Sequence, residues 1–136
     1  MAVFMGNTVT VTINSVDLTD HITSVSGFNE TCADLVTTAM SETNVSRIGG
    51  IKDSSVSITF LNDFAASEVY ATLASLLGTA VAVTITPTSA AVSATNPKKT
   101  GSCLVTALPF IDGSLGDLAE ESVTWPVTGA FSTATS

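Results

Sequence analysis

The sequence predicts a mainly β protein of the α+β class, a β-sandwich or half-barrel of about seven strands with one flanking α-helix. Short segments alternate apolar and polar residues, the pattern of strands that are buried on one face. Threonine and serine account for 39 of the 136 residues, and the branched threonine side chain favours strands. Only one segment, residues 64–77, repeats its apolar residues at helical spacing.

The predicted strands are segments with apolar residues at alternate positions or with an extended composition. They span, in order, residues 8–14, 22–30, 31–40, 54–61, 79–86, 102–108 and 118–127. Val9 and Val11 share the apolar face of the first strand, and Trp125 lies among the apolar residues of the last. We therefore expect Trp125 in the core. Residues 112–117, rich in Asp and Gly, form a turn.

The single predicted helix covers residues 64–77 and presents one apolar stripe. The residues of this stripe are Phe64, Val69, Tyr70, Leu73, Leu76 and Leu77. Asp63 precedes the stripe as an N-cap, and Gly78 follows it as the residue that ends the helix.

Two long polar loops and two small-residue termini complete a single domain of residues 1–136. The loops span residues 41–53 and 87–100, and the first of them contains the Gly49–Gly50 pair. Residues 1–6 form an N-terminal arm and residues 129–136 a C-terminal tail. We expect these segments to be mobile or ordered by a partner.

The charge balance excludes several classes of protein. Four Lys and Arg oppose twelve Asp and Glu, for a net charge of −8. A protein that grips a nucleic-acid backbone needs several cations on one face, so tight binding to DNA or RNA is not predicted. No segment offers the roughly 20 uninterrupted apolar residues of a membrane span.

Neither a metal site nor a catalytic site is predicted. Cys32 and Cys103 lie far apart, and His21 is the only histidine, whereas structural zinc needs four such ligands. The cysteines are expected to be two buried free thiols, with one disulfide as the alternative. His21 lies beside a turn, where a surface or hydrogen-bonded role is typical, and the paired carboxylates also lie in turns. We therefore expect no enzyme activity and no cofactor.

Self-assembly is the function that the composition favours. Charged residues make up only 12% of the chain, and charge is depleted at the centres of protein interfaces. The strands also carry few lysines or prolines that would block pairing with another chain. A monomeric β-domain with ordinary loops is the alternative.

Particular segments carry a family resemblance across nearly the whole chain. These are residues 10–21, residues 47–53 with the sequence RIGGIKD, residues 63–68, residues 87–97 and residues 123–127. Together they resemble the major tail (tail tube) proteins of long-tailed, siphovirus-type phages that infect actinobacteria.

The resemblance implies a β-sandwich flanked by a helix, six copies of which form a ring. Rings stack into a tail tube through which DNA passes during ejection without specific binding. The protein would then be part of the virion, assembled in the host cytoplasm, with itself and the tape-measure, terminator and distal tail proteins as partners. By position, residues 41–53, 1–6 and 129–136 would contact neighbouring subunits.

The resemblance also suggests roles for individual residues. The expected inter-subunit contacts are Arg47, Ile48, Gly49, Gly50, Ile51, Lys52, Phe4 and Phe131. Arg47 and Lys52 would form salt bridges between subunits. Glu30, Asp34 and Glu42 are the expected lumen-facing acids, with ordinary exposed positions as the alternative. Six copies at −8 each would carry −48, a charge that repels the DNA duplex.

Two other functions remain as alternatives. One is a head decoration or head–tail joining protein of a virion, which would use a similar sandwich. The other is a monomeric β-domain that binds a surface or a carbohydrate, although a single Trp and a single Tyr offer little for stacking on sugars.

Overall fold

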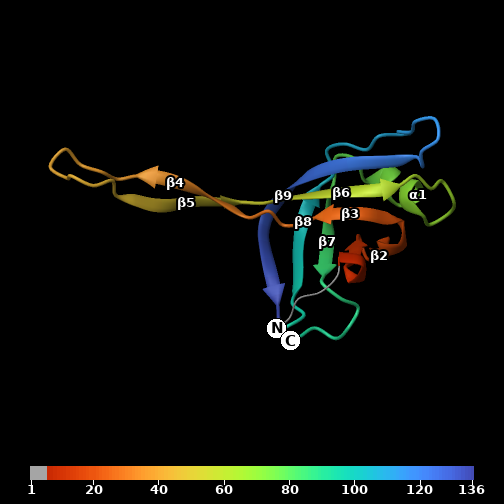
Figure 1. Cartoon of the computed structure of the whole chain (residues 1–136), viewed down its shortest axis with the longest axis horizontal. Coiled ribbons are helices and arrows are strands. Elements are labelled where there is room, and N and C mark those ends of the chain that lie inside the picture. The colour runs from red at the N-terminus through yellow and green to blue at the C-terminus, as the bar shows by residue number, and fades with distance from the viewer. Residues whose placement is uncertain (1–5) are drawn as a thin grey trace.

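The computed structural model describes residues 6–136 as a curled β-sheet from which a two-stranded hairpin projects (Figure 1). The strands are β1 (Thr10–Ile13), β2 (Val16–Asp17), β3 (Ile22–Ser26), β4 (Thr31–Val36), β5 (Arg47–Asp53), β6 (Ser55–Leu61), β7 (Ala80–Thr86), β8 (Lys98–Leu104) and β9 (Glu120–Ala134). The helical elements are η1 (Gly6–Thr8), η2 (Thr19–His21), α1 (Val69–Leu73) and η3 (Ala74–Leu76). No helix in this range is long and apolar enough to cross a bilayer.

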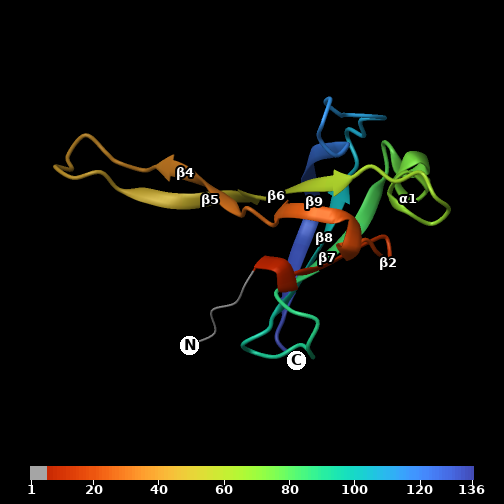
Figure 2. The ribbon, with the colours of Figure 1, turned by 45° about the vertical axis from the view of Figure 1, so that its right-hand side comes forward.

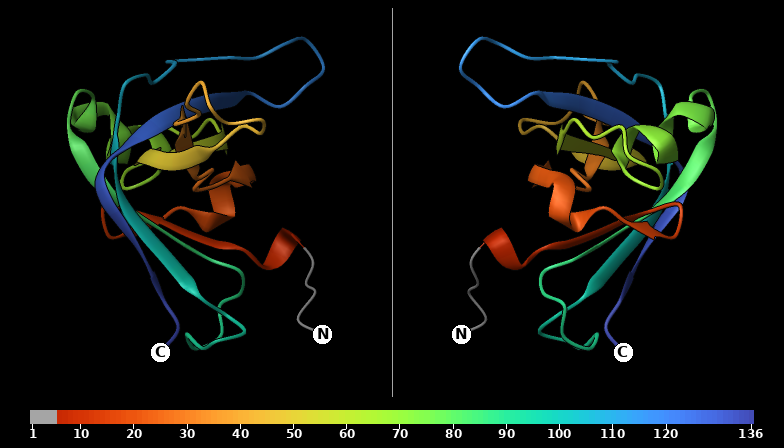
Figure 3. Two further views of the ribbon diagram at one scale, coloured as in Figure 1. Left: turned by 90° about the vertical axis from the view of Figure 1, so that its left-hand side faces the viewer. Right: turned by 90° about the vertical axis from the view of Figure 1, so that its right-hand side faces the viewer.

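Seven strands form one antiparallel sheet in the order β2-β1-β7-β8-β9-β6-β3. The sheet curls strongly, as the view along the long axis shows (Figure 3). This arrangement confirms the predicted mainly β half-barrel. Strands β4 and β5 form a separate sheet of their own.

The curl depends on β9, which is 15 residues long and belongs to both halves of the sheet. Its first half pairs with β6 and its second half with β8. Pro126 lies where β9 passes from one partner to the other, a position where its missing N–H breaks no central ladder. Farther along, Gly129 adopts φ +76° at a bulge opposite β8, a conformation that disfavours other residues.

The core lies inside the curl and follows the predicted alternation. Along β6, Val56, Ile58 and Phe60 are buried, while the residues between them are partly exposed. Trp125 is fully buried, as predicted, 6.3 Å from Phe60 between ring centroids. Its indole Nε1–H donates to the carbonyl oxygen of Ala107 at 3.0 Å, so the one polar atom of the ring is satisfied.

The helical segment is much shorter than the predicted range 64–77. It begins at Val69 and ends as a 3₁₀ turn at Leu76. Ser67 adopts φ +65°, which is incompatible with a right-handed helix, and this residue prevents an earlier start. Asp63 is not the N-cap, since its carboxylate instead accepts from the backbone N–H of Ala65 and contacts His21.

Three further expectations differ from the structure. Residues 47–53 of the expected loop form strand β5, and residues 129–134 of the expected tail belong to β9. Of the two thiols expected to be buried, Cys103 is buried but Cys32 is exposed on β4, and both are free. The residues of the predicted N-terminal arm before Gly6, including Phe4, lie outside the described part of the chain.

Candidate assembly surface

The most distinctive feature is a two-stranded projection, here called the hairpin arm, formed by residues 31–53. Strands β4 and β5 pair antiparallel, from Thr31 opposite Asp53 to Val36 opposite Arg47. Figures 1 and 2 show the arm extending from the sheet as a free ribbon. A two-stranded ribbon without a covering layer is only marginally stable in water.

The sequence of β5 explains how the two strands pack so closely. A Cβ added at Gly50 would lie 3.0 Å from the Cβ of Ala33 and 3.1 Å from a methyl of Leu35. A Cβ at Gly49 would lie 3.1 Å from the sulfur of Cys32. The glycine pair therefore leaves room for side chains of β4 to lie across β5.

The arm exposes apolar side chains that a lone soluble domain would bury. These residues are Leu35, Val36, Met40, Val45, Ile48 and Ile51, whose exposure ranges from 48% to 106%. Clustered exposed apolar groups mark interaction sites more often than ordinary surface. The arm also carries Arg47 and Lys52, which are two of the four cations in the chain.

The three acids expected to face a lumen lie at different places and do not form one group. Glu30 forms an ion pair with Lys99 of β8, and Asp34 accepts from Arg47 at 2.5 Å across the arm. Glu42 lies in the loop at the tip, where its carboxylate accepts from the hydroxyl of Ser46 at 3.0 Å. Arg47 thus has an ion-pair partner within its own chain. Because both side chains are exposed, the pair of Arg47 and Asp34 contributes little to the stability of the fold.

Phe131, the expected contact of the C-terminal tail, is half-buried on β9. The ammonium of Lys99 lies 5.5 Å from the centroid of its ring, in a cation–π arrangement. A Cβ at Gly101 opposite would lie 2.8 Å from the ring of Phe28 and 3.2 Å from the Cβ of Phe131, so the glycine leaves room for both residues. Phe131 therefore helps to attach the last strand to the sheet.

A cluster of acids around His21 fastens the segment before α1 to the sheet. The Nε2 atom lies 2.9 Å from Asp63, and Nδ1 lies 2.9 Å from Asp20 and 3.3 Å from Glu68. Partial burial opposes the charged imidazole, but these three carboxylates outweigh it and raise the pKa of His21. The backbone N–H of Ala65 and then the imidazole lower the pKa of Asp63.

The same cluster contains one possible set of metal ligands. One ligand atom from each of His21, Asp63 and Glu68 lies within 4.8 Å of the others. Both imidazole nitrogens already contact carboxylates, so the contacts join η2 to residues 63–68 and become ion pairs when the imidazole is protonated. His21 and Asp63 are 42 residues apart in the sequence, and no local sequence pattern predicts that they come into contact.

A second exposed apolar surface lies at the end of the molecule opposite the arm. Phe64, Tyr70 and Phe110 form a mutual aromatic cluster with ring centroids 5.1 to 5.4 Å apart. Together with exposed Ile111, which follows Phe110 in the loop after β8, these residues form what we call the aromatic patch. Asp112 and Asp117 of the same loop line a shallow hollow together with Glu120, the first residue of β9.

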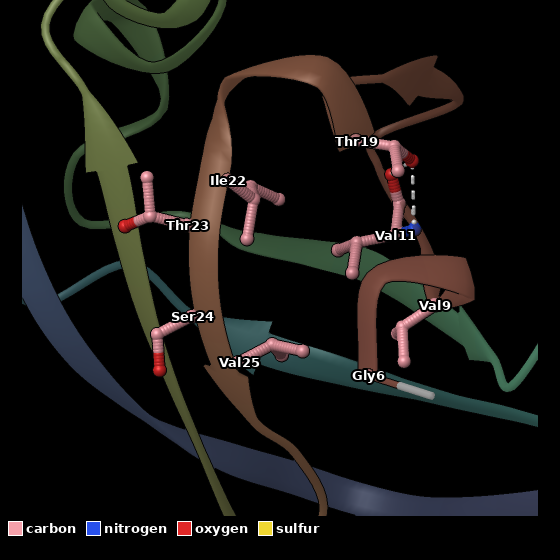
Figure 4. Close-up of a pocket in the computed structure, with 8 residues that line it drawn as sticks. All are labelled: Gly6, Val9, Val11, Thr19, Ile22, Thr23, Ser24 and Val25. Carbon is pink, nitrogen blue, oxygen red and sulfur yellow. Dashed lines mark hydrogen bonds between the residues drawn. The ribbon is translucent and has the colours of Figure 1, made fainter. Parts of the chain in front are cut away.

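A pocket of about 320 Å³ lies where the curl of the sheet brings β3 to face β1 (Figure 4). Val9, Val11, Ile22 and Val25 supply its apolar lining, and Thr19 bridges its wall by accepting from the backbone N–H of Val11 at 3.0 Å. Among residues 6–136, the side chains that line the pocket are aliphatic or carry hydroxyls, and none of them is an acid or a base.

Chains from solved structures of a virion, a tail and a tail tube share this fold. A chain from the virion of a native gene transfer agent particle has a TM-score of 0.76 and 13% identity, over 98% of this chain and all of that one. A chain of the SPP1 tail tube has a TM-score of 0.75 and 12% identity, over 98% of this chain and 80% of that one. A chain from the tail of an empty gene transfer agent particle, with C6 symmetry, has a TM-score of 0.64 and 13% identity, over 85% of this chain and 83% of that one.

No protein-family model and no curated protein sequence matches the chain. At 12–13% identity, the structural likeness establishes the fold. The molecule therefore has the tail-tube-like architecture that the sequence predicted, over almost its whole length.

Proposed function

We propose that this protein is a structural subunit of a phage tail tube and acts without catalysis. The hairpin arm is the observation that carries the proposal, because it exposes apolar side chains along a ribbon with no covering layer. The shared fold supports the proposal, since two of the similar chains belong to a tail and to a tail tube.

In this proposal, six copies form each ring and the rings stack into a tube through which DNA passes. The protein then belongs to the tail of a siphovirus-type virion that infects an actinobacterium, and assembles in the host cytoplasm. Its partners are other copies of itself and the tape-measure, terminator and distal tail proteins. Six copies at −8 each carry −48, which keeps the duplex from adhering to the wall.

The proposal assigns the contacts between subunits to the arm and the termini. Arg47, Ile48, Gly49, Gly50, Ile51 and Lys52 supply the arm contacts, and Phe4 and Phe131 the terminal ones. Glu30, Asp34 and Glu42 face the lumen in the assembled tube, where the ion pairs of Glu30 and Asp34 temper their charge. Reversing the charge at both Arg47 and Lys52 tests the arm, and normal tubes from that variant contradict its assignment.

Negative-stain electron microscopy of the concentrated protein tests the function itself. Long tubes of uniform diameter or stacked rings are the expected result. Shells or single caps would instead identify a head decoration or head–tail joining protein. A monomer of 13.8 kDa at every concentration would favour a surface-binding β-domain and overturn the proposal.

A further inference from the structure

The surroundings of His21 are the one place within residues 6–136 where three metal-binding side chains converge. One ligand atom from each of His21, Asp63 and Glu68 lies within 4.8 Å of the other two. Ligands at about 2.1 Å from a tetrahedral zinc ion lie roughly 3.4 Å apart, so small rotations of these side chains bring them to the required spacing. The three side chains are only 16%, 32% and 35% exposed, so solvent screens their charges less than at an open surface.

The fold holds these ligands in place before any ion arrives. Strand β3 begins at Ile22, which pairs with Phe60 of β6, and His21 therefore lies beside the segment that follows β6. The backbone N–H of Ala65 donates to Oδ1 of Asp63 at 2.9 Å, while Oδ2 lies 2.9 Å from Nε2 of His21. Ligands that are already positioned lose less conformational freedom when an ion binds.

The acids around His21 carry more negative charge than neighbouring residues neutralise. Asp20 also contacts Nδ1, at 2.9 Å, so three carboxylates surround one imidazole. No Lys or Arg side chain within residues 6–136 forms an ion pair with any of these three carboxylates. A protonated imidazole balances one of the three negative charges, whereas a divalent cation balances two. Binding of such a cation therefore relieves more of the repulsion between the carboxylates than a proton does.

The combination of one nitrogen with carboxylate oxygens determines the class of metal. Imidazole and carboxylate together suit a first-row divalent ion such as Zn²⁺, whereas Mg²⁺ and Ca²⁺ prefer oxygen ligands alone. The imidazole nitrogen that does not bind the ion keeps a carboxylate partner, because Nδ1 contacts Asp20 and Nε2 contacts Asp63. A carboxylate in this position orients the ring of most metal-bound histidines.

We propose that His21, Asp63 and Glu68 of each chain bind one divalent transition-metal ion of the Zn²⁺ type. With three protein ligands, a water molecule occupies the fourth position of the tetrahedron. The ion joins η2, which leads into the outermost strand β3, to residues 63–68, which follow β6, and so stabilises this edge of the sheet. The site lies within a single chain, so the proposal does not depend on assembly into a tube.

Calorimetric titration of the untagged full chain with Zn²⁺, after treatment with a chelator, tests the proposal. We expect one Zn²⁺ per chain and a higher melting temperature with Zn²⁺ than with the same concentration of Mg²⁺. Glu68→Gln should weaken zinc binding by more than about tenfold, since loss of an outer-shell partner alone costs roughly 10- to 100-fold. Glu120→Gln is the matched control, because it removes a partly buried carboxylate from the shallow hollow and should leave zinc binding unchanged.

Two further features of the chain make the result specific. Cys32 carries an exposed free thiol, which is itself a zinc ligand, so all titrations use the Cys32→Ser background. His21 is the only histidine, so the imidazole signals in a ¹H–¹⁵N NMR spectrum report on this residue alone and should shift when Zn²⁺ is added. That shift is measured with all three ligands present, so it decides the question even if a variant loses stability.

The outcomes that overturn the proposal differ from those that bear on the tail tube. Zinc binding that is absent, or equally tight in Glu68→Gln and in its Cys32→Ser parent, overturns the metal site. So does a loss in Glu120→Gln as large as that in Glu68→Gln, or an imidazole spectrum that saturating Zn²⁺ leaves unchanged. None of these results affects the proposed function, which electron microscopy of the assembled protein tests separately.

Discussion

Leu73→Ala should destabilise the fold by about 3 kcal/mol, because Leu73 fastens α1 to the core. Its side chain is fully buried beside that of Val69. Truncating a buried leucine costs about 2 to 5 kcal/mol through lost transfer energy and the cavity left behind. The unfolding entropy of about 2.1 cal/mol/K per residue gives about 0.29 kcal/mol/K for 136 residues. The melting temperature should therefore fall by about 10 °C.

Leu77→Ala is the matched control, since the same residue type four positions later is 56% exposed. Its cost should stay within about 0.5 kcal/mol, the usual range for surface changes. Urea denaturation followed by the fluorescence of Trp125 measures both values, and the slope with urea should not change. Equal costs for Leu73→Ala and Leu77→Ala would show that the segment packs on its other face and would refute the reasoning.

Three further substitutions test the polar contacts. His21→Gln should destabilise the fold most below about pH 6.5, because the stabilisation that comes with a raised pKa is complete there and is lost as the pH rises through the folded-state pKa. Equal losses of unfolding free energy at pH 6 and pH 9, measured in urea, would contradict this. Glu121→Gln should raise the melting temperature at pH 8 and leave it unchanged at pH 4, since burial raises the pKa of Glu121 and penalises its ionised form. A lower melting temperature of the variant at pH 8 would show that the buried carboxylate does not destabilise the fold. Trp125→Phe should cost about 1 to 3 kcal/mol in urea by leaving the carbonyl of Ala107 unpaired, and a loss below about 0.3 kcal/mol would show that water replaces the indole.

Strands with one buried face could be predicted from the sequence because burial imposes a period of two. Val56, Ile58 and Phe60 alternate with polar residues, and the structure buries all three. The arm escaped prediction as a hairpin for the same reason. Both of its faces are open, so burial imposes no period on residues 47–53, and the glycine pair resembles a loop.

Contacts between distant segments were the other part that sequence patterns could not supply. Asp63 precedes a helical apolar stripe and therefore looks like an N-cap, but its carboxylate contacts His21, 42 residues away. Residues 131–134 at the end of β9 pair with β8 although none of them is fully buried. In both cases the tertiary partner, rather than the local pattern, decides the conformation.

The two outermost strands of the seven-stranded sheet bear on when assembly can begin. Strand β2 is only two residues long, and β3 has an irregularity between Ile22 and Ser24. Short or interrupted edge strands are poor templates for adding another chain. In the proposed tube, newly made copies should therefore stay apart until several of them are aligned at once, so nucleation would be slow and growth fast.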